Sequence, residues 1–299
     1  MALIALRLAI GWHFFQEGSD KIHSGKFSSV GFLSNAKGPL KPSFENMIWD
    51  GDGYHRLNKD ETLDAWSAYK EDAIAHYGFD DKQIKTADQL NKQYAEQFTW
   101  YLGSNAEDID EYFLGLERRD KYRGLAEEQT PADLSKARAM SEVPSLRGQL
   151  TKIEGELKKK RDGWLRAIDT IWSNYERDMN ALATDEQRSE GPIKIPRVGR
   201  RSLDSVAVDA IIPYFDLTIG ILLILGLFTR VASICGALFL ASVVLSQWPL
   251  APDAGPSIYQ AIEMFALLVL AGTAAGRFAG LDFFVNAALC KCCTKKQES

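Results

Sequence analysis

The chain has 299 residues and a formal net charge of −5; 46% of its residues are hydrophobic, 25% are charged, and the mean hydropathy is −0.18. These values exclude a collagen-like repeat, a disulfide-stapled miniprotein and a disordered chain. The charges are unevenly distributed, because residues 24–204 carry 28 of the 35 Lys and Arg residues and 32 of the 40 Asp and Glu residues. We therefore expect an apolar part and a polar part with different structures.

The first apolar stretch, residues 1–23, is expected to be a transmembrane helix. Arg7 interrupts the apolar run and no small-residue cleavage site follows Phe15, which favours a spanning helix over the alternative, a secretory signal peptide. Glu17 and Lys21 are spaced i,i+4, which predicts a polar end of this helix near the membrane surface.

The polar segment, residues 24–204, is too long for a structureless loop, and we expect it to form a helical domain. Apolar residues recur at helical spacing across residues 63–116, and Thr130 before Pro131 is typical of a helix start. One long helix is expected from Pro144 to about Ala183. The segment contains no cysteine, so we expect no internal disulfide. The basic run 158–161 is expected to be a solvated face, with binding to anionic lipid as the alternative.

Residues 50–61 (DGDGYHRLNKDE) carry part of the pattern of a calcium-binding loop. Asp50, Asp52, Asn58 and Glu61 occupy ligand positions of that pattern, but His55 stands where the loop needs glycine for its sharp turn. A Gly-rich turn that leads into the cap of the next helix explains the same residues. Calcium binding is therefore left open.

Three further apolar runs follow, at residues 210–228, 231–248 and 258–275. Each is long enough for a helix to cross a hydrocarbon core of ~30 Å. With the first helix they predict an all-α fold: a four-helix transmembrane bundle formed by residues 1–23 and 205–289, a helical insertion at 24–204, and a cytoplasmic tail at 290–299.

The orientation follows from basic residues beside the short loops. Those at positions 230, 277, 291, 295 and 296 all lie on the side of the two termini, which predicts cytoplasmic termini and residues 24–204 outside, in the periplasm. Four basic residues between 194 and 201 oppose this orientation, but long loops translocate largely regardless of charge.

The four cysteines lie in the last third of the chain. Cys235 falls within a predicted span and is expected to be a small apolar residue. Cys290, Cys292 and Cys293 are expected to be free thiols, because three thiols without a nearby histidine make a weak metal site. We expect no metal centre.

Five ionisable residues lie in or beside the predicted spans, and each is a candidate functional residue because charge inside a membrane is costly. They are Arg7, His13, Glu17, Asp216 and Glu263. Counted at 1.5 Å per residue, His13, Asp216 and Glu263 fall in the outer half of the bilayer, Glu17 lies nearer the surface and Arg7 lies deeper.

Two interpretations of these five residues stay open. In the first, the five residues form a quinone site, with Glu17, Asp216 and Glu263 as candidates for proton transfer, because quinone reduction takes up protons along with electrons. Alternatively they form a structural network, in which Arg7 and a carboxylate neutralise each other.

Three segments resemble the DoxX/DoxD family of bacterial membrane proteins. Residues 7–21 (RLAIGWHFFQEGSDK) resemble its first helix, residues 220–230 (GILLILGLFTR) its second helix and turn, and Glu263 with residues 276–282 (GRFAGLD) its last helix and ending. The large insertion departs from the family pattern. Few residues precede Arg7, and the sequence leaves open whether the true start lies upstream of Met1.

The resemblance implies a four-helix membrane bundle associated with quinone-linked oxidoreductases, of which thiosulfate:quinone oxidoreductase gives the family its name. We expect a multi-pass subunit of a respiratory or sulfur-related redox complex in the bacterial inner membrane. Its partners would be the lipid bilayer and a redox or periplasmic protein, and not nucleic acid. The alternative is a non-enzymatic membrane scaffold whose periplasmic helical domain docks a partner protein.

Overall fold

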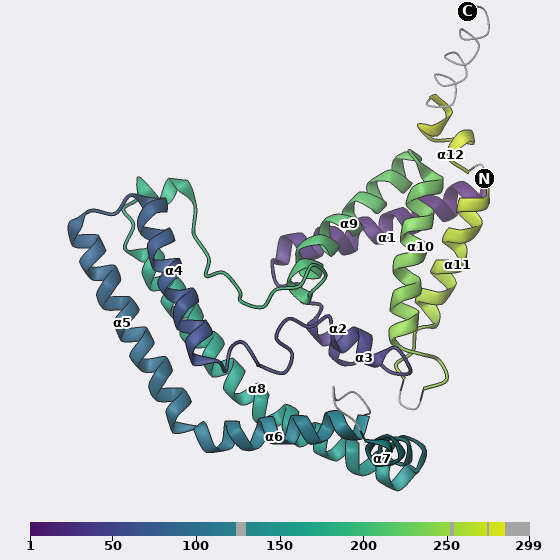
Figure 1. Cartoon of the computed structure of the whole chain (residues 1–299). Helices are drawn as coiled ribbons and strands as arrows, with labels where there is room; N and C mark the ends of the chain where they lie inside the picture. The colour runs from purple at the N-terminus through teal and green to yellow at the C-terminus, as the bar shows by residue number, and fades with distance from the viewer. Residues whose placement is uncertain (124–129, 252–253, 274, 285–299) are drawn as a thin grey trace, which may run out of the picture. The chain divides into compact units, whose positions relative to one another are not determined.

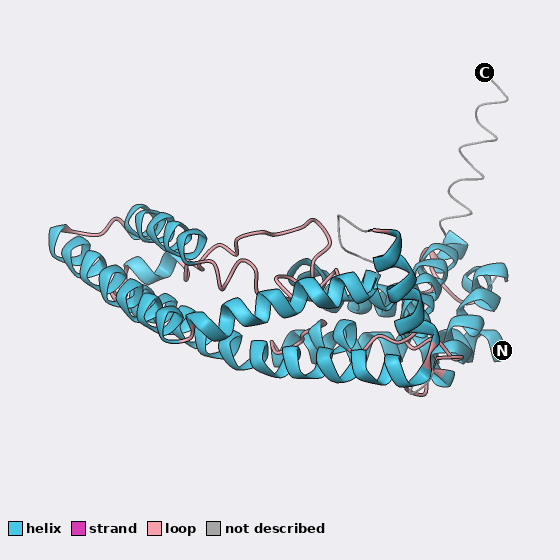
Figure 2. Cartoon of the chain, turned by 60° about the horizontal axis from the view of Figure 1, so that its bottom comes forward, coloured by secondary structure: helices cyan, strands magenta, loops and turns pink. Residues whose placement is uncertain are grey.

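The computed structural model describes residues 1–123, 130–251, 254–273 and 275–284. Within these ranges every regular element is a helix, which confirms the all-α prediction (Figure 2). Contacts divide the chain into two compact units, which we call unit 1 (residues 1–49 and 200–299) and unit 2 (residues 50–199). Each is described by itself.

Unit 1 holds the apolar helices. They are α1 (Ala2–Ser24), α2 (Val30–Ser34), α3 (Lys41–Glu45), α9 (Ser205–Leu225), α10 (Thr229–Ser246), α11 (Ile258–Gly272) and α12 (Ala275–Phe278). Their shared core includes Ile10, Phe14, Leu223, Leu240 and Leu267, all of them buried. The ends follow local signals: α1 and α9 stop at Gly25 and Gly226, both left-handed, and the side chain of Asp204 caps the start of α9.

The helices α1 and α9 pack closely along their length, although almost the whole polar segment separates them in sequence (Figure 1). Glycines make this approach possible. A Cβ atom at Gly18 would lie 2.3 Å from the backbone nitrogen of Leu217, and one at Gly220 would lie 2.4 Å from that of Phe15. Contacts of this kind, with residue numbers rising on one helix as they fall on the other, make the pair antiparallel.

Residues 25–49 belong to unit 1, whereas the sequence analysis assigned them to the polar insertion that begins at residue 24. Backbone atoms bind this segment to the apolar helices: Ser29 donates to the Asp209 carboxylate at 2.6 Å, and Lys37 donates to the carbonyl of Ser246 at 2.7 Å. The polar composition of the segment does not reveal these contacts, because main-chain atoms make them.

Unit 2 is a helical array around the long helix α8 (Pro144–Ala181). The expected helix from Pro144 to about Ala183 is thus confirmed to within two residues at its end. The other elements are α4 (Lys59–Tyr77), α5 (Asp81–Ser104), α6 (Ala106–Arg123), α7 (Pro131–Glu142) and the 3₁₀ turn η1 (Gln187–Glu190). Thr130 pairs with Asp133 at the start of α7, as its sequence predicts.

Aromatic side chains fill the core of unit 2. Trp66 of α4 contacts Phe98 of α5 and Tyr175 of α8, with ring centroids 5.3 and 5.1 Å apart. All three side chains are fully buried. This core explains how a highly charged segment without cysteine folds.

Two helices within the described residues, α9 and α10, are long and apolar enough to cross a membrane. The other two expected spans fall short of that standard: α11 has 15 residues, and the charges of α1 lower its hydropathy. Only 28% of the most apolar 18-residue stretch of α9, and 39% of that of α10, is buried inside the protein. Their outward faces are therefore apolar, whereas a core helix of a water-soluble protein buries most of its apolar residues.

Candidate functional site

The structure separates the five candidate residues into three groups, all within unit 1. Lys21 binds Asp216 and Glu17, His13 binds Glu263, and Arg7 binds backbone carbonyls. A single site that contains all five does not form.

The first group is an ion pair between α1 and α9. Lys21 Nζ lies 2.6 Å from Asp216 Oδ2 and 3.3 Å from Glu17 Oε2, one helical turn away. The Asp216 side chain is almost fully buried, and no described residue hydrogen-bonds to its Oδ1. The expected structural network is therefore present in part, with Lys21 as the cation instead of Arg7.

The second group joins α1 to α11. His13 Nδ1 and Glu263 Oε1 share a hydrogen bond of 2.8 Å. Glu263 is mostly covered, whereas 57% of the His13 side chain is exposed. This pair connects two helices that otherwise pack much less closely than α1 and α9 or α10 and α11.

An apolar groove lies beside this pair, along the seam between α1 and α11. Its volume is about 280 Å³, and it is lined by Leu6, Ala9, Ile10, Tyr259, Ile262, Glu263 and Ala266. Glu263 is the one ionisable carboxylate in this lining. Along α11 the carboxylate of Glu263 lies between the lining residues Tyr259 and Ala266, so the groove is apolar on both sides of one acidic group.

The third group joins α1 to the segment that follows α11. Arg7 is 2% exposed, and it donates to the carbonyls of Ala275 and Ala279 at 3.2 and 2.7 Å. Beside it, Asp282 accepts hydrogen bonds from the backbone N–H groups of Phe228 and Thr229 at the start of α10. In the structural-network alternative Arg7 and a carboxylate neutralise each other. The guanidinium donates to backbone carbonyls, and the carboxylate that acts on its charge is Asp282, which is not one of the five candidates.

Sequence reasoning missed the central position of Lys21 and the part played by Tyr259 and Ile262 in the groove. The i,i+4 spacing predicts the approach of Lys21 to Glu17, which the structure contains as the longer of its two ion pairs. The available signal was a count of charges: the predicted spans carry more acids than Arg7 alone balances. Nothing in the sequence indicated which helix would face Lys21.

In the possible calcium loop, two of the candidate ligand carboxylates bind arginines. Asp50 accepts hydrogen bonds from Arg56, and Asp52 makes a two-oxygen pair with Arg119, with both distances 2.9 Å. Asn58 caps α4 by accepting from the backbone of Asp60 and Glu61. Of the two interpretations of residues 50–61, the structure contains the turn and helix cap. Cys290, Cys292 and Cys293 lie outside the described residues.

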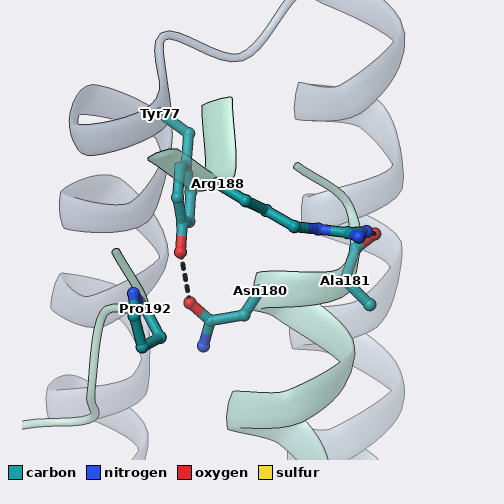
Figure 3. A pocket seen from close by; sticks show the side chains of 5 residues that line it. All are labelled: Tyr77, Asn180, Ala181, Arg188 and Pro192. Atoms are coloured by element: carbon teal, nitrogen blue, oxygen red, sulfur yellow. Dashed lines mark hydrogen bonds between the residues drawn. The ribbon is translucent and has the colours of Figure 1, made fainter. Parts of the chain in front are cut away.

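A second hollow, of about 350 Å³, lies in unit 2 (Figure 3). The hydroxyl of Tyr77 hydrogen-bonds to Asn180 Oδ1 at 2.5 Å, and Arg188 donates to the carbonyl of Ala181 at 3.0 Å. Because these polar groups bind one another across the connection after α8, the hollow offers no converging set of free donors to a ligand.

No protein-family model, curated protein or solved structure matches the chain. The resemblance to the DoxX/DoxD family stays a prediction that rests on the residues named above.

Proposed function

We propose that the chain is an integral membrane subunit of a quinone-linked redox complex, of the respiratory or sulfur-related type, and that a quinone binds in the groove between α1 and α11. The observation that carries this proposal is that Glu263, which lines an apolar groove, is hydrogen-bonded to His13. In the same proposal the chain resembles the DoxX/DoxD family, crosses the bacterial inner membrane four times and keeps both termini in the cytoplasm.

The outer surface of unit 1 supports the membrane setting. Large apolar side chains that point away from the core continue around three helices: Ile211 and Tyr214 on α9, Leu238 on α10, and Phe265 and Val269 on α11, each at least half exposed. Large apolar side chains exposed on three helices of one unit are typical of contact with lipid tails. The lining residues Tyr259 and Ile262 are themselves largely exposed, so a lipid-soluble ligand would enter the groove sideways from the bilayer.

The groove offers a quinone both an apolar wall and one hydrogen-bonded acid. The isoprenoid chain of a quinone packs against Leu6, Ala9 and Ile10, and the headgroup lies beside Glu263 and His13. An imidazole and a carboxylate supply the hydrogen bonds and the protons that quinone reduction requires. The groove volume of about 280 Å³ accommodates the quinone ring. The part of the isoprenoid tail that extends beyond Leu6, Ala9 and Ile10 would lie in lipid.

Binding of a short-chain ubiquinone to the protein in mild detergent tests this proposal. Ala9→Leu fills the groove and is expected to weaken binding at least about ten-fold, whereas the matched variant Ala5→Leu, on the exposed surface outside the groove lining, is expected to bind like the wild type. Absence of binding by the wild-type protein, or equal binding by both variants, would contradict the proposal.

The second candidate function is a scaffold whose helical unit docks a periplasmic protein. Trp100 on α5 favours it, because 71% of this large aromatic residue is exposed and Trp is common at the centres of protein interfaces. Co-purification of a partner that Trp100→Ala abolishes, from a protein that carries no quinone, is the result expected of a scaffold.

A further inference from the structure

Three ionisable side chains follow one face of α1. His13, Glu17 and Lys21 are spaced i, i+4 and i+8, so consecutive members lie about 6 Å apart along the helix axis. The stripe begins at His13, which binds Glu263 of the groove lining, and continues to the end of α1, where Gly25 stops the helix.

Glu17 is the exposed acid of the stripe, and by the count of 1.5 Å per residue it lies nearer the membrane surface than His13. Its side chain is 54% exposed and approaches Lys21 to 3.3 Å. Lys21 lies closer to Asp216, at 2.6 Å, and that buried carboxylate is its main partner. Lys21 and Asp216 thus form a fixed pair, and the Glu17 carboxylate is left able to turn along the helix.

His13 connects this position to the groove. Its Nδ1 is bound to Glu263, while the rest of the exposed ring faces away from that bond. An imidazole that receives a proton on one nitrogen releases one from the other. A carboxylic acid at Glu17 is one helical turn away from the ring, within the reach of one bridging water.

We propose that Glu17 takes up protons from water and passes them through His13 to Glu263 and the ligand in the groove. This inference rests on the proposed quinone site and adds its route for protons. Asp216 and Lys21 are charged neighbours of this route and stay paired throughout.

Each proton reaches the quinone through three successive transfers. Glu17 gives its proton to His13 Nε2, His13 releases the Nδ1 proton to Glu263, and Glu263 protonates a quinone oxygen. Water then reprotonates Glu17. The electrons come from a redox subunit of the complex, so the quinone gains two electrons and two protons and becomes the quinol.

The test uses the full-length protein, loaded with a short-chain ubiquinone and reduced at an electrode. Glu17→Gln keeps the size of the side chain but carries no exchangeable acid proton. We expect its rate of coupled proton uptake to fall at least about ten-fold, with unchanged quinone affinity. Added formic acid, a small diffusible acid, is expected to restore the rate, which a purely structural role for Glu17 would not predict. The control is Asp20→Asn, an exposed acid on the same helix.

Each outcome has a distinct meaning. An unchanged rate in Glu17→Gln overturns the proton route while quinone binding stands. Loss of quinone affinity in Glu17→Gln also overturns it, because Glu17 then belongs to the binding site. A wild-type protein that binds no quinone overturns both the route and the proposed function.

Discussion

Lys21 is the cationic partner of the buried acid of unit 1. Asp216 is 1% exposed, its Oδ2 is bound to Lys21, and no described residue hydrogen-bonds to its Oδ1. A buried carboxylate that loses its cation is strongly destabilising, whereas replacing both partners by apolar residues is often neutral. The pair is therefore a place where single and double substitutions have opposite consequences.

We expect Lys21→Met to destabilise the protein by ~3–5 kcal/mol and the double variant Lys21→Met with Asp216→Leu to recover most of that loss. Thermal unfolding in detergent, followed by size-exclusion chromatography, measures the difference. Glu17→Gln is the control, expected to cost at most ~1 kcal/mol because Glu17 is exposed. Equal stability of Lys21→Met and Glu17→Gln would show that Asp216 does not need its cation.

At the scale of the elements, the approach of α1 to α9 depends on small residues. The nearest atoms to a Cβ at Gly18 would be backbone atoms of α9, which cannot turn aside as a side chain does. Close backbone approach through small residues is the usual way in which helices associate in lipid, where burial of apolar surface gives little driving force.

Gly18→Ala is expected to destabilise unit 1 by ~1–3 kcal/mol, since α1 and α9 must separate to admit the methyl group. Gly272→Ala is the matched control, because nothing lies within 4 Å of a Cβ at that position in α11. Its stability is expected to equal or slightly exceed that of the wild type. Thermal melts of both variants decide the point; equal melting temperatures would argue against close packing at Gly18.

The aromatic core of unit 2 is sensitive to alkali. Burial, together with the hydrogen bond that Tyr94 donates to Asp178, raises the pKa of Tyr94 from 10.0 to about 12. The folded state therefore favours the neutral phenol more than the unfolded state does. Its contribution to stability is complete below pH 10 and is lost as the pH rises through about 12. Burial also raises the pKa of Tyr69, Tyr112 and Tyr175, with the same sign.

We expect the stability of unit 2 to be insensitive to tyrosine ionisation below pH 10 and to fall between pH 10 and about 12. Urea unfolding at a series of pH values, followed by circular dichroism and by tyrosinate absorbance, measures this loss. Tyr94→Phe removes one titrating group, so the fall is expected to be shallower. An identical pH profile for the wild type and Tyr94→Phe would place the sensitivity elsewhere.

At the scale of the whole molecule, charge and apolar surface are divided between the two units. Unit 1 exposes large apolar side chains and buries Arg7 and Asp216, whereas unit 2 has an aromatic core and a charged surface with many ion pairs. This division is what a protein needs if one unit lies among lipid tails and the other in water.

The proposed topology predicts that unit 2 is reachable from outside the cytoplasm. Lys92→Cys, at an exposed position of α5, is expected to react with an impermeant maleimide in intact spheroplasts. The unsubstituted chain is the control, because its tail cysteines at 290, 292 and 293 are expected to react only after lysis. Labelling of Lys92→Cys only in lysed cells would reverse the orientation.

Local patterns in the sequence predicted the long helices. Periodic apolar residues, the caps at Asn58 and Asp204, and the glycines at positions 25 and 226 are local signals, and each acts on the turn of backbone beside it. The polar and apolar parts could be separated for the same reason, since composition is a property of each segment alone. The distinction between one long helix and several short ones in residues 144–183 also came from spacing.

Which side chains meet depends on how the helices pack. Periodicity gives the face of a helix but not the partner of that face, nor the register in which two helices lie. Lys21 reaches Asp216 across 195 positions because glycines let α1 and α9 approach in one antiparallel register. Arg7 donates to the carbonyls of Ala275 and Ala279 because the segment around α12 packs beside α1. Contacts between distant segments depend on packing of the whole bundle, and no local pattern records them.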